Sequence, residues 1–404
     1  MKTIWMFNQF AVSPDMPGGT RHYDFASELV KKGFDVYIFA SDFSLQEMKF
    51  KKLNENESYK VENINGVNFV WVKTLPYKKN DYKRLINQFV FAFTVFRISG
   101  KFKRPDAIIG SSPQLLTAFA AYIRSLKTKS KFIAEIRDLW PESLIVLQPK
   151  AKYNPYVWLL YIISIILYRR SDEIIVFTEE NRDLISKKGF DKKKIHFIPN
   201  GINTDTKVNT VNAQKIKNRL KLDKFTIAYS GSIGVANNLE MMVEVAERIG
   251  NEKDIEILII GDGPLKSKIS DEIKLKKLAN IRILNPLPKN QIFDFLSVID
   301  ICFITLADIP LFRYGVSPNK LFDYMYVGKP IIASVGGWTN EQVIKANCGI
   351  AVEPNKVDEF VKAIIQMRKM SLKDRIDMGI KGRMHAINYY SRNNLVKKLI
   401  KILN

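Results

Sequence analysis

The sequence has few of the residues that form disulfides or bind metals, with 2 cysteines and 3 histidines among 404 residues. Neither Cys302 nor Cys348 belongs to a CxxC pair, which excludes a disulfide framework and indicates a reducing compartment. The histidines are scattered and no Asp-x-Asp triplet occurs, so we expect no metal and no cofactor. A Walker A motif and a GxSxG motif are also missing, which argues against a P-loop NTPase and an α/β-hydrolase.

Long hydrophobic runs are missing as well. No stretch reaches the roughly 18–20 apolar residues that span a bilayer. The nearest, residues 157–168, is apolar on every helical face, so we expect it to be fully buried, with a membrane interface as the alternative. Asn8 and Gln9 interrupt the amino-terminal apolar run, which favours a first β-strand over a signal peptide. These features predict a cytoplasmic protein.

Charge is strongly biased to one sign. The chain has 63 Lys and Arg against 41 Asp and Glu, a net charge of +22. Such an excess attracts nucleic acid, an anionic membrane or phosphorylated small molecules, although a lysine-rich genome would account for part of it. The apolar share of 46% is typical of a globular protein, and the length suits two domains of about 200 residues each.

Short apolar segments alternate with longer amphipathic segments in both halves of the chain. Strands are predicted at 4–7, 35–40, 67–72, 107–110, 132–136, 174–177, 225–229, 255–260, 281–284, 299–304 and 330–333. This alternation predicts an α/β fold with two Rossmann-like, doubly wound domains whose strand ends face a central cleft. We place the domains at 1–203 and 220–387, with a linker at 203–218 and a C-terminal helix at 388–404 that packs back on the first domain.

Two glycine-bearing loops each connect a predicted strand to a helix. The first contains Gly18, Gly19 and Arg21, and the second contains Gly231, Ser232 and Gly234. Glycines let a backbone approach a ligand closely, and a following helix offers free N–H groups to an anion. Arg21 adds a candidate charge-assisted contact. Ordinary strand-to-helix turns are the alternative for both loops.

The most informative segment is 317–324. Ser317 is the predicted N-cap, and Pro318 the first residue, of a helix that Gly328 ends. Its amino terminus suits a pyrophosphate, and an anion there would explain Lys320, whose charge otherwise opposes the helix dipole. Asp323 lies on the same helical face, where a carboxylate accepts hydrogen bonds from two ribose hydroxyls. A Lys–Asp surface pair is the alternative.

A further polar cluster follows the predicted strand at 132–136. It contains Arg137, Asp138 and Trp140. Trp140 is suited to stack on a sugar ring, and Asp138 to orient or deprotonate a hydroxyl. The alternative is a buried structural Arg–Asp pair.

Together, and in this order along nearly the whole chain, these segments resemble the family 4 glycosyltransferases, which are retaining enzymes of the GT-B fold. Residues 18–21 are similar to the family's acceptor-side glycine loop, 199–202 to its interdomain turn, and 260–264 to its GxGP strand end. The resemblance implies a donor site made of Gly231, Ser232, Gly234, Gly261, Gly263, Leu287, Pro288, Ser317, Asn319, Lys320 and Asp323. It implies acceptor-side residues Gly18, Gly19, Arg21, Arg137 and Trp140, with Asp138 as the catalytic residue.

The DLWPES run at 138–143 is similar to the branch that builds O-antigens and capsules, including N-acetyl-fucosamine transferases. That resemblance implies a UDP-sugar donor, a lipid-diphosphate-linked sugar acceptor and peripheral binding to the anionic inner face of the plasma membrane. The segment 78–104, where Lys and Arg interleave with Phe and Tyr, suits such an interface.

The sequence also departs from the family pattern. Gly315 stands where many members have a first glutamate, Asp323 where they have a second, and Ser232 where a basic residue is common. Two other hypotheses remain open, a sugar-nucleotide 2-epimerase of the same fold and a non-catalytic basic binding protein. Recognised nucleic-acid-binding motifs are missing, so we expect no nucleic acid partner.

Overall fold

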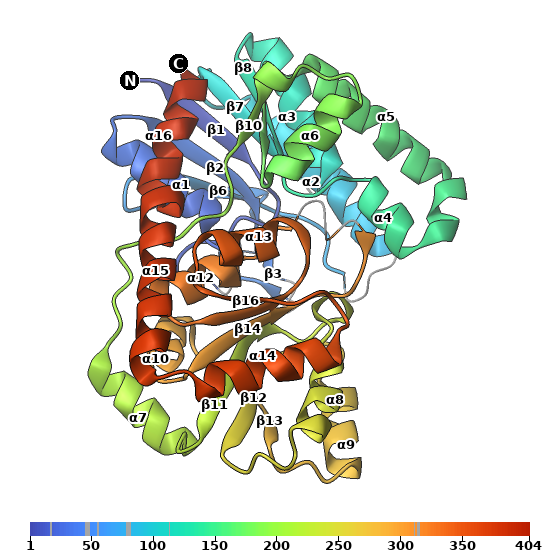
Figure 1. The fold of residues 1–404 in the computed structure, drawn as a ribbon. Coiled ribbons are helices and arrows are strands. Elements are labelled where there is room, and N and C mark those ends of the chain that lie inside the picture. The colour runs from blue at the N-terminus through green and yellow to red at the C-terminus, as the bar shows by residue number, and fades with distance from the viewer. Residues whose placement is uncertain are drawn as a thin grey trace. The chain divides into compact units, whose positions relative to one another are not determined.

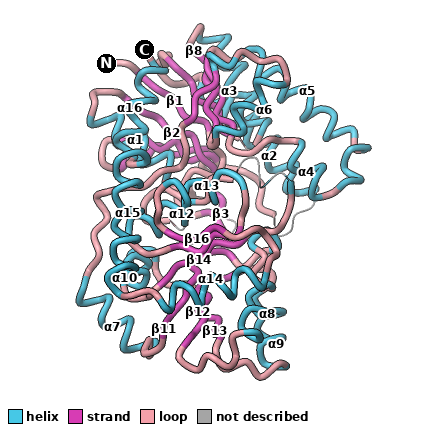
Figure 2. Tube along the Cα trace, in the orientation of Figure 1, coloured by secondary structure: helices cyan, strands magenta, loops and turns pink. Residues whose placement is uncertain are grey.

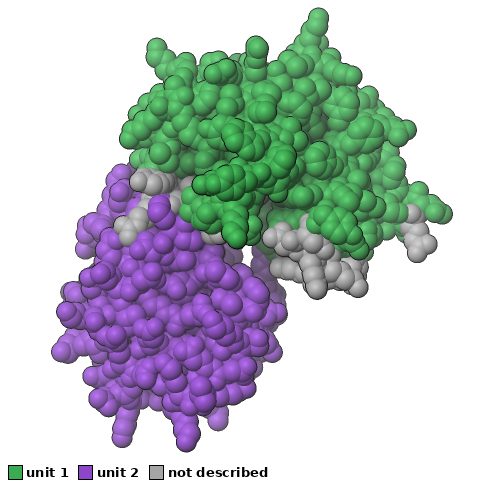
Figure 3. All heavy atoms as spheres, turned by 90° about the vertical axis from the view of Figure 1, so that its right-hand side faces the viewer, with its two compact units in different colours: residues 1–199, 392–404 green, residues 200–391 purple. Residues whose placement is uncertain are grey.

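The computed structural model describes residues 1–16, 18–44, 49–54, 56–77, 82–112, 114–310, 312 and 316–404. The chain forms two compact units (Figure 3). Unit 1 comprises residues 1–199 and 392–404, and unit 2 comprises residues 200–391. Each unit is an α/β domain built on a mainly parallel sheet (Figures 1 and 2). The two Rossmann-like domains expected from the sequence are thus confirmed.

Unit 1 has a sheet whose order, within the described residues, is β10-β9-β8-β7-β1-β2-β6-β5. Its strands are β1 (Thr3–Phe7), β2 (Asp35–Ser41), β5 (Tyr59–Ile64), β6 (Val67–Val72), β7 (Ala107–Ser111), β8 (Lys131–Ile136), β9 (Glu173–Val176) and β10 (Ile195–Phe197), with a separate hairpin of β3 (Phe43–Ser44) and β4 (Lys49–Phe50). β1 pairs in parallel with β2 on one side and β7 on the other, and β5 runs antiparallel to β6. The winding direction therefore reverses between β1 and β7, the place where such sheets bind ligands.

The helices of unit 1 cover a sheet whose central strands are buried on both faces. They are α1 (Arg21–Lys31), α2 (Tyr82–Ser99), α3 (Leu115–Thr128), α4 (Glu142–Leu147), α5 (Pro155–Arg170), α6 (Glu179–Lys187) and α16 (Arg392–Leu403). All five residues of β1 are buried, as expected for a parallel strand between two helical layers. α16 packs beside α1, and its Leu395 and Leu399 join the core of the sheet (Figure 1).

Helix α5 differs from its prediction. Asn154 caps it by accepting a hydrogen bond from the Tyr156 backbone, and Pro155 takes the first helical position. Val157 and Leu160 are buried, but Trp158 and Ile162 are 62% and 54% exposed. Full burial of this helix was therefore a wrong expectation, because only one of its apolar faces has protein to pack against.

Unit 2 contains a six-stranded parallel sheet in the order β13-β12-β11-β14-β15-β16, as far as the structure describes it. Its elements are α7 (Thr210–Leu220), β11 (Phe225–Ser232), α8 (Met241–Arg248), β12 (Ile255–Asp262), α9 (Lys266–Leu275), β13 (Ile281–Leu284), α10 (Ile292–Ser297), β14 (Ile301–Thr305), α12 (Asn319–Val327), β15 (Ile331–Ser334), α13 (Gly337–Lys345), β16 (Gly349–Ala351), α14 (Val357–Lys369) and α15 (Leu372–Tyr390). Numbered from β11, this order is the doubly wound 3-2-1-4-5-6 arrangement, with its switch point between β11 and β14.

The predicted linker is not an extended connection. The chain passes from unit 1 to unit 2 after Pro199, and most of the segment 203–218 belongs to unit 2 as helix α7. Asn209 caps this helix, and Ala213 and Ile216 are buried on its inner side. Within the helical part of the segment only those two positions are buried, which explains the polar composition that suggested a linker.

Candidate functional site

In unit 2, the loops after β11 and β12 lie directly against each other. The two strands pair in parallel register up to Ser232 and Asp262. A Cβ atom on Gly261 would lie 1.8 Å from the Gly231 carbonyl oxygen, and one on Gly263 would lie 2.4 Å from the Ile233 carbonyl oxygen. Gly261 and Gly263 are therefore required for packing of backbone on backbone, whether or not a ligand is bound.

Helix α12 begins differently from its prediction. Its first residue is Asn319, Pro318 occupies the N-cap position, and no side chain caps the helix. The Ser317 hydroxyl is buried and, among the described residues, has no hydrogen-bond partner. Its carbonyl accepts a hydrogen bond from the Asn200 side-chain amide at 2.8 Å. The expected Ser317 cap was thus wrong, and within the described residues no side chain caps the first N–H groups of α12.

Lys320 connects the first turn of α12 to the carboxyl end of β11. Its Nζ donates a hydrogen bond to the Tyr229 hydroxyl at 2.8 Å and lies 4.2 Å from the centroid of the Tyr229 ring. A Cβ on Gly231 would lie 3.2 Å from the same Nζ. Burial lowers the pKa of Lys320 to about 8, while Asp323 opposes the shift. This ammonium and the helix amino terminus together form a site suited to an anion.

The other predicted donor residues that the structure describes also belong to unit 2. Ser232 is exposed and Gly234 is half-buried in the loop after β11, and Asp323 is half-buried on α12. Leu287 and Pro288 follow the end of β13, at the same carboxyl edge of the sheet. Asn319 is exposed as the first residue of α12. Gly315, which stands where many family members have a first glutamate, lies outside the described residues.

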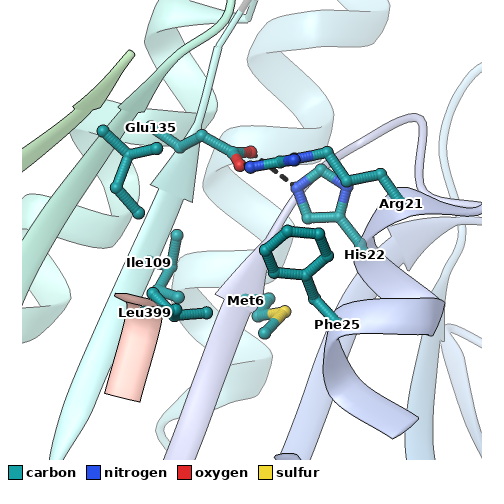
Figure 4. Close-up of a pocket in the computed structure, with 8 residues that line it drawn as sticks. Met6, Arg21, His22, Phe25, Ile109, Glu135 and Leu399 are labelled. Atoms are coloured by element: carbon teal, nitrogen blue, oxygen red, sulfur yellow. Dashed lines mark hydrogen bonds and ion pairs between the residues drawn. The ribbon is translucent and has the colours of Figure 1, made fainter. Parts of the chain in front are cut away.

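In unit 1, Arg21 is part of a buried charged cluster at the ends of β1, β7 and β8 (Figure 4). Its Nε donates to Glu135 Oε1 at 3.0 Å, and its two Nη atoms donate to the carbonyls of Pro199 and Ile198. The guanidinium lies 4.2 Å from the centroid of the Phe25 ring. Arg21 is only 4% exposed, and its contacts join α1 to β8 and to the segment that ends at Pro199; its predicted contact with an acceptor stays a prediction.

His22 and Glu135 complete this cluster, and no role was predicted for either residue from the sequence. His22 Nε2 lies 2.8 Å from Glu135 Oε2, and the Ser111 hydroxyl donates to the same oxygen at 2.7 Å. Burial opposes ionisation of Glu135, but His22 and Arg21 outweigh it and hold its pKa well below the usual range. Burial is also the main influence on His22 and lowers its pKa. The sequence signal that could have indicated this cluster is a glutamate, Glu135, within the otherwise apolar strand predicted at 132–136.

Asp138, Arg137 and Trp140 lie on the turn between β8 and α4. Asp138 is exposed and Trp140 is half-buried, with its backbone N–H donating to the Asp138 carbonyl at 2.9 Å. The Arg137 backbone donates to the Ser112 hydroxyl at 2.9 Å, which joins the ends of β7 and β8. Gly18, with a φ of 122°, and Gly19 are both exposed in the loop before α1. Desolvation by the surrounding protein raises the pKa of the Asp138 carboxyl, and Arg137 opposes the shift. The catalytic role of Asp138 stays a prediction.

Comparison with known protein families covers both units. Residues 18–206 match the model described as Glycosyltransferase Family 4, and residues 211–385 match Glycosyl transferases group 1. The chain is therefore a glycosyltransferase, which decides against the two alternatives left open by the sequence. It belongs to the GT-B enzymes of family 4, as the motifs in register predicted.

Particular relatives support this assignment. The chain is 24% identical to the putative colanic acid biosynthesis glycosyl transferase WcaI of Escherichia coli K12, over 96% of each chain. It is 24% identical to an Escherichia coli UDP-Gal:α-D-GlcNAc-diphosphoundecaprenol α-1,3-galactosyltransferase, over 61% of this chain and 62% of that one.

Solved structures share the fold. Sucrose-phosphate synthase from Thermosynechococcus elongatus matches with a TM-score of 0.77 at 14% identity, over 100% of this chain and 98% of that one. Anabaena HepE, crystallised with UDP-glucose, matches with a TM-score of 0.72 at 12% identity, over 100% and 99% of the two chains. At these identities the likeness establishes the GT-B fold.

The described residues include no helix that is both long and apolar enough to cross a membrane. They also include no cluster of three or more His, Cys, Asp or Glu side chains that could hold a metal ion.

Proposed function

We propose that this glycosyltransferase moves a sugar from a UDP-linked donor to a lipid-diphosphate-linked saccharide, with retention at the anomeric carbon, during cell-surface polysaccharide synthesis. The observation that carries the donor half of the proposal is Lys320, whose ammonium is held at the switch point of unit 2 beside a helix amino terminus. The transferred sugar is proposed to be an N-acetylated deoxy-hexosamine such as N-acetyl-fucosamine.

The comparisons support a UDP-sugar and a lipid-linked acceptor. HepE was crystallised with UDP-glucose, and the Escherichia coli galactosyltransferase is named for a UDP-galactose donor and a diphosphoundecaprenol-linked acceptor. In this chain, the diphosphate would accept hydrogen bonds from Lys320 and from the first N–H groups of α12. The Asp323 carboxylate, one turn further along the helix, would accept the ribose hydroxyls.

The proposed reaction exchanges one bond at the anomeric carbon for another. The bond from that carbon to the diphosphate oxygen breaks, and a bond to the acceptor oxygen forms on the same face of the sugar. The acceptor proton passes to the departing diphosphate, whose negative charge Lys320 and the α12 amino terminus stabilise. Asp138 would orient the acceptor hydroxyl, and no metal is required in this scheme.

A nucleotide screen tests the donor. UDP should raise the thermal unfolding midpoint, because a ligand that binds only the folded state stabilises it, whereas GDP, ADP and CMP should not. Lys320→Met should weaken UDP binding by about 10- to 100-fold, the value of a charge-assisted contact. Lys266→Met is the matched control, since Lys266 follows β12 and donates to Asn285. A shift with GDP alone would redirect the donor to GDP-sugars, and no shift would contradict the donor site.

Turnover of an Asp138→Asn variant tests the acceptor half. We expect kcat to fall with little change in UDP affinity, because Asp138 belongs to unit 1 and the proposed nucleotide site to unit 2. Near-normal turnover would remove Asp138 from the mechanism. The anomeric configuration of the product, read from its NMR coupling constants, tests retention independently.

A lipid-linked acceptor requires the enzyme to reach a membrane, and one surface of unit 1 supports peripheral binding at the cytoplasmic face. On α2, Phe89 and Phe93 are 45% and 68% exposed, and on α5 Trp158 and Ile162 are similarly exposed. The two helices are neighbours, with the Phe89 and Tyr156 ring centroids 6.0 Å apart (Figure 1). Exposed basic residues on or beside these helices are Lys83, Arg97, Lys152, Arg169 and Arg170. Aromatic and basic groups together suit an anionic bilayer.

Sedimentation with vesicles tests this surface. The protein should co-sediment with vesicles rich in phosphatidylglycerol at low salt, and less so with phosphatidylcholine vesicles or at high salt. The double variant Phe93→Ser with Trp158→Ser should lose most of the binding. Leu372→Ser with Ile376→Ser on α15 is the control, because these side chains are 64% and 49% exposed in unit 2. Failure of the wild-type protein to sediment at low salt would contradict membrane binding.

A further inference from the structure

Tyr229 lies near the carboxyl end of β11, two residues before Gly231 on the same strand. Its side chain is fully buried, and its hydroxyl lies 2.7 Å from the Ser232 carbonyl oxygen and 3.1 Å from Asn237 Oδ1. A phenol has one proton to donate, and its oxygen remains free to accept. The hydrogen bond that it accepts comes from Lys320 Nζ at 2.8 Å. Tyr229 therefore joins the loop after β11 to the first turn of α12.

A second tyrosine makes the reciprocal connection. Tyr324 lies on α12, and its hydroxyl accepts a hydrogen bond from the Ser230 backbone N–H at 3.0 Å. Tyr229 of β11 thus contacts α12, and Tyr324 of α12 contacts the end of β11. This pair fixes the separation of the two segments that would have to bind one diphosphate together.

Lys320 has three N–H donors on a flexible four-carbon stem. One donor goes to the phenol oxygen, and the aromatic ring stabilises the cation from a centroid distance of 4.2 Å. Within the described residues, no carboxylate forms an ion pair with this ammonium. As far as the structure describes the chain, two donors therefore remain for an anion, beside Gly231, where a side chain would contact the ammonium.

We propose that Tyr229 is a positioning residue for the donor, holding the Lys320 ammonium in place and in its charged form where the diphosphate binds. This inference rests on the proposed function, because it assumes a nucleotide diphosphate at this site. The contribution of Tyr229 comes from its hydroxyl and its ring, since the residue has no exposed surface with which to touch the donor.

Several other titratable groups surround α12. Asp323 on the same helix favours the charged form of Lys320, and Cys302 of β14 is a buried thiol whose own pKa is raised. Arg383 of α15 lies over the Tyr326 ring, and Asp294 of α10 accepts a hydrogen bond from the Asn209 backbone. Of the described titratable groups, it is the Tyr229 hydroxyl that accepts a hydrogen bond from the ammonium.

The experiment measures the UDP dissociation constant by calorimetry between pH 6.5 and 9.5. In the wild type, affinity should fall as the pH rises through about 8, because Lys320 then loses its proton, and the ionisation of UDP itself is common to every variant. Tyr229→Phe removes the hydroxyl that accepts from the ammonium, so the fall should begin at lower pH and UDP should bind about 3- to 10-fold more weakly at pH 8. Tyr229→Leu removes the ring as well and should have a larger effect.

The control is the same change in a Lys320→Met background, where Tyr229→Phe should leave UDP affinity unchanged. An equal loss at every pH, or an equal loss in the Lys320→Met background, would show a purely structural role and overturn the proposal. A direct NMR titration of Lys320 in the ligand-free Tyr229→Phe protein is the second readout and should show a lowered midpoint. Wild-type protein that binds no UDP would overturn the proposed donor site itself, which distinguishes the two failures.

Discussion

At the scale of single residues, the buried cluster around Arg21 has the clearest energetic consequence. Arg21→Met should lower the free energy of unfolding of unit 1 by about 3–5 kcal/mol, because it leaves the Glu135 charge buried without its cation. Arg21→Met combined with Glu135→Met should regain part of that loss, since no isolated charge then remains. Denaturant unfolding of the three proteins measures both effects. A single variant as stable as the wild type would show that the cluster is not a structural connection.

His22 gives the same cluster a pH dependence. Its pKa in the folded protein is below the ordinary value of about 6.5, so the unfolded chain binds the proton first as the pH falls. Its contribution to stability is complete above about pH 6.5 and is lost below it, by up to about 1.4 kcal/mol per pH unit. His22→Gln should flatten this dependence between pH 6.5 and 5. His385 of unit 2 has a pKa lowered in the same direction and remains in the variant as an internal reference.

At the scale of elements, the contact between the loops after β11 and β12 sets the shape of the candidate donor site. Gly261→Ala should destabilise unit 2 by about 1–3 kcal/mol, because the new Cβ would overlap the Gly231 carbonyl and force the two loops apart. Gly234→Ala is the matched control, since its Cβ would find its nearest neighbour at 3.7 Å. Thermal unfolding with and without UDP measures both changes. Equal behaviour of the two variants would contradict the packing argument.

At the scale of the whole molecule, the chain returns to its first unit after completing the second. Leu399 of α16 is 2% exposed and packs in the core of unit 1, next to residues of β1 and α1. Leu399→Ala should therefore destabilise unit 1 by about 2–5 kcal/mol through the cavity it leaves. The exposed Lys397→Ala on the same helix should change stability little. In calorimetry, Leu399→Ala should lower the unfolding transition of unit 1, which UDP does not raise. If the variant instead lowered only the transition that UDP raises, the prediction would be wrong.

Much of the molecule could be predicted because the signal is local. The segments at 67–72 and 281–284 are strands with the expected bounds, since short segments rich in β-branched and aromatic residues favour strands. Gly328 ends α12 in a left-handed conformation, as expected of a residue without a side chain. The family assignment also followed from motif order, which is a property of the chain alone.

The tertiary structure decided what each polar side chain contacts. Arg21 and Lys320 both stood in apparent ligand-binding segments, yet the first is enclosed by Glu135 and two carbonyls while the second keeps donors available beside Gly231. The same distinction applies to α5, whose uniform apolarity conceals one buried and one exposed face. Sequence alone determined the elements and the enzyme class, because periodicity and glycine positions are encoded locally. The partners of a buried charge come from segments far apart in the chain, as Glu135 and Tyr229 do, and only the folded arrangement brings them together.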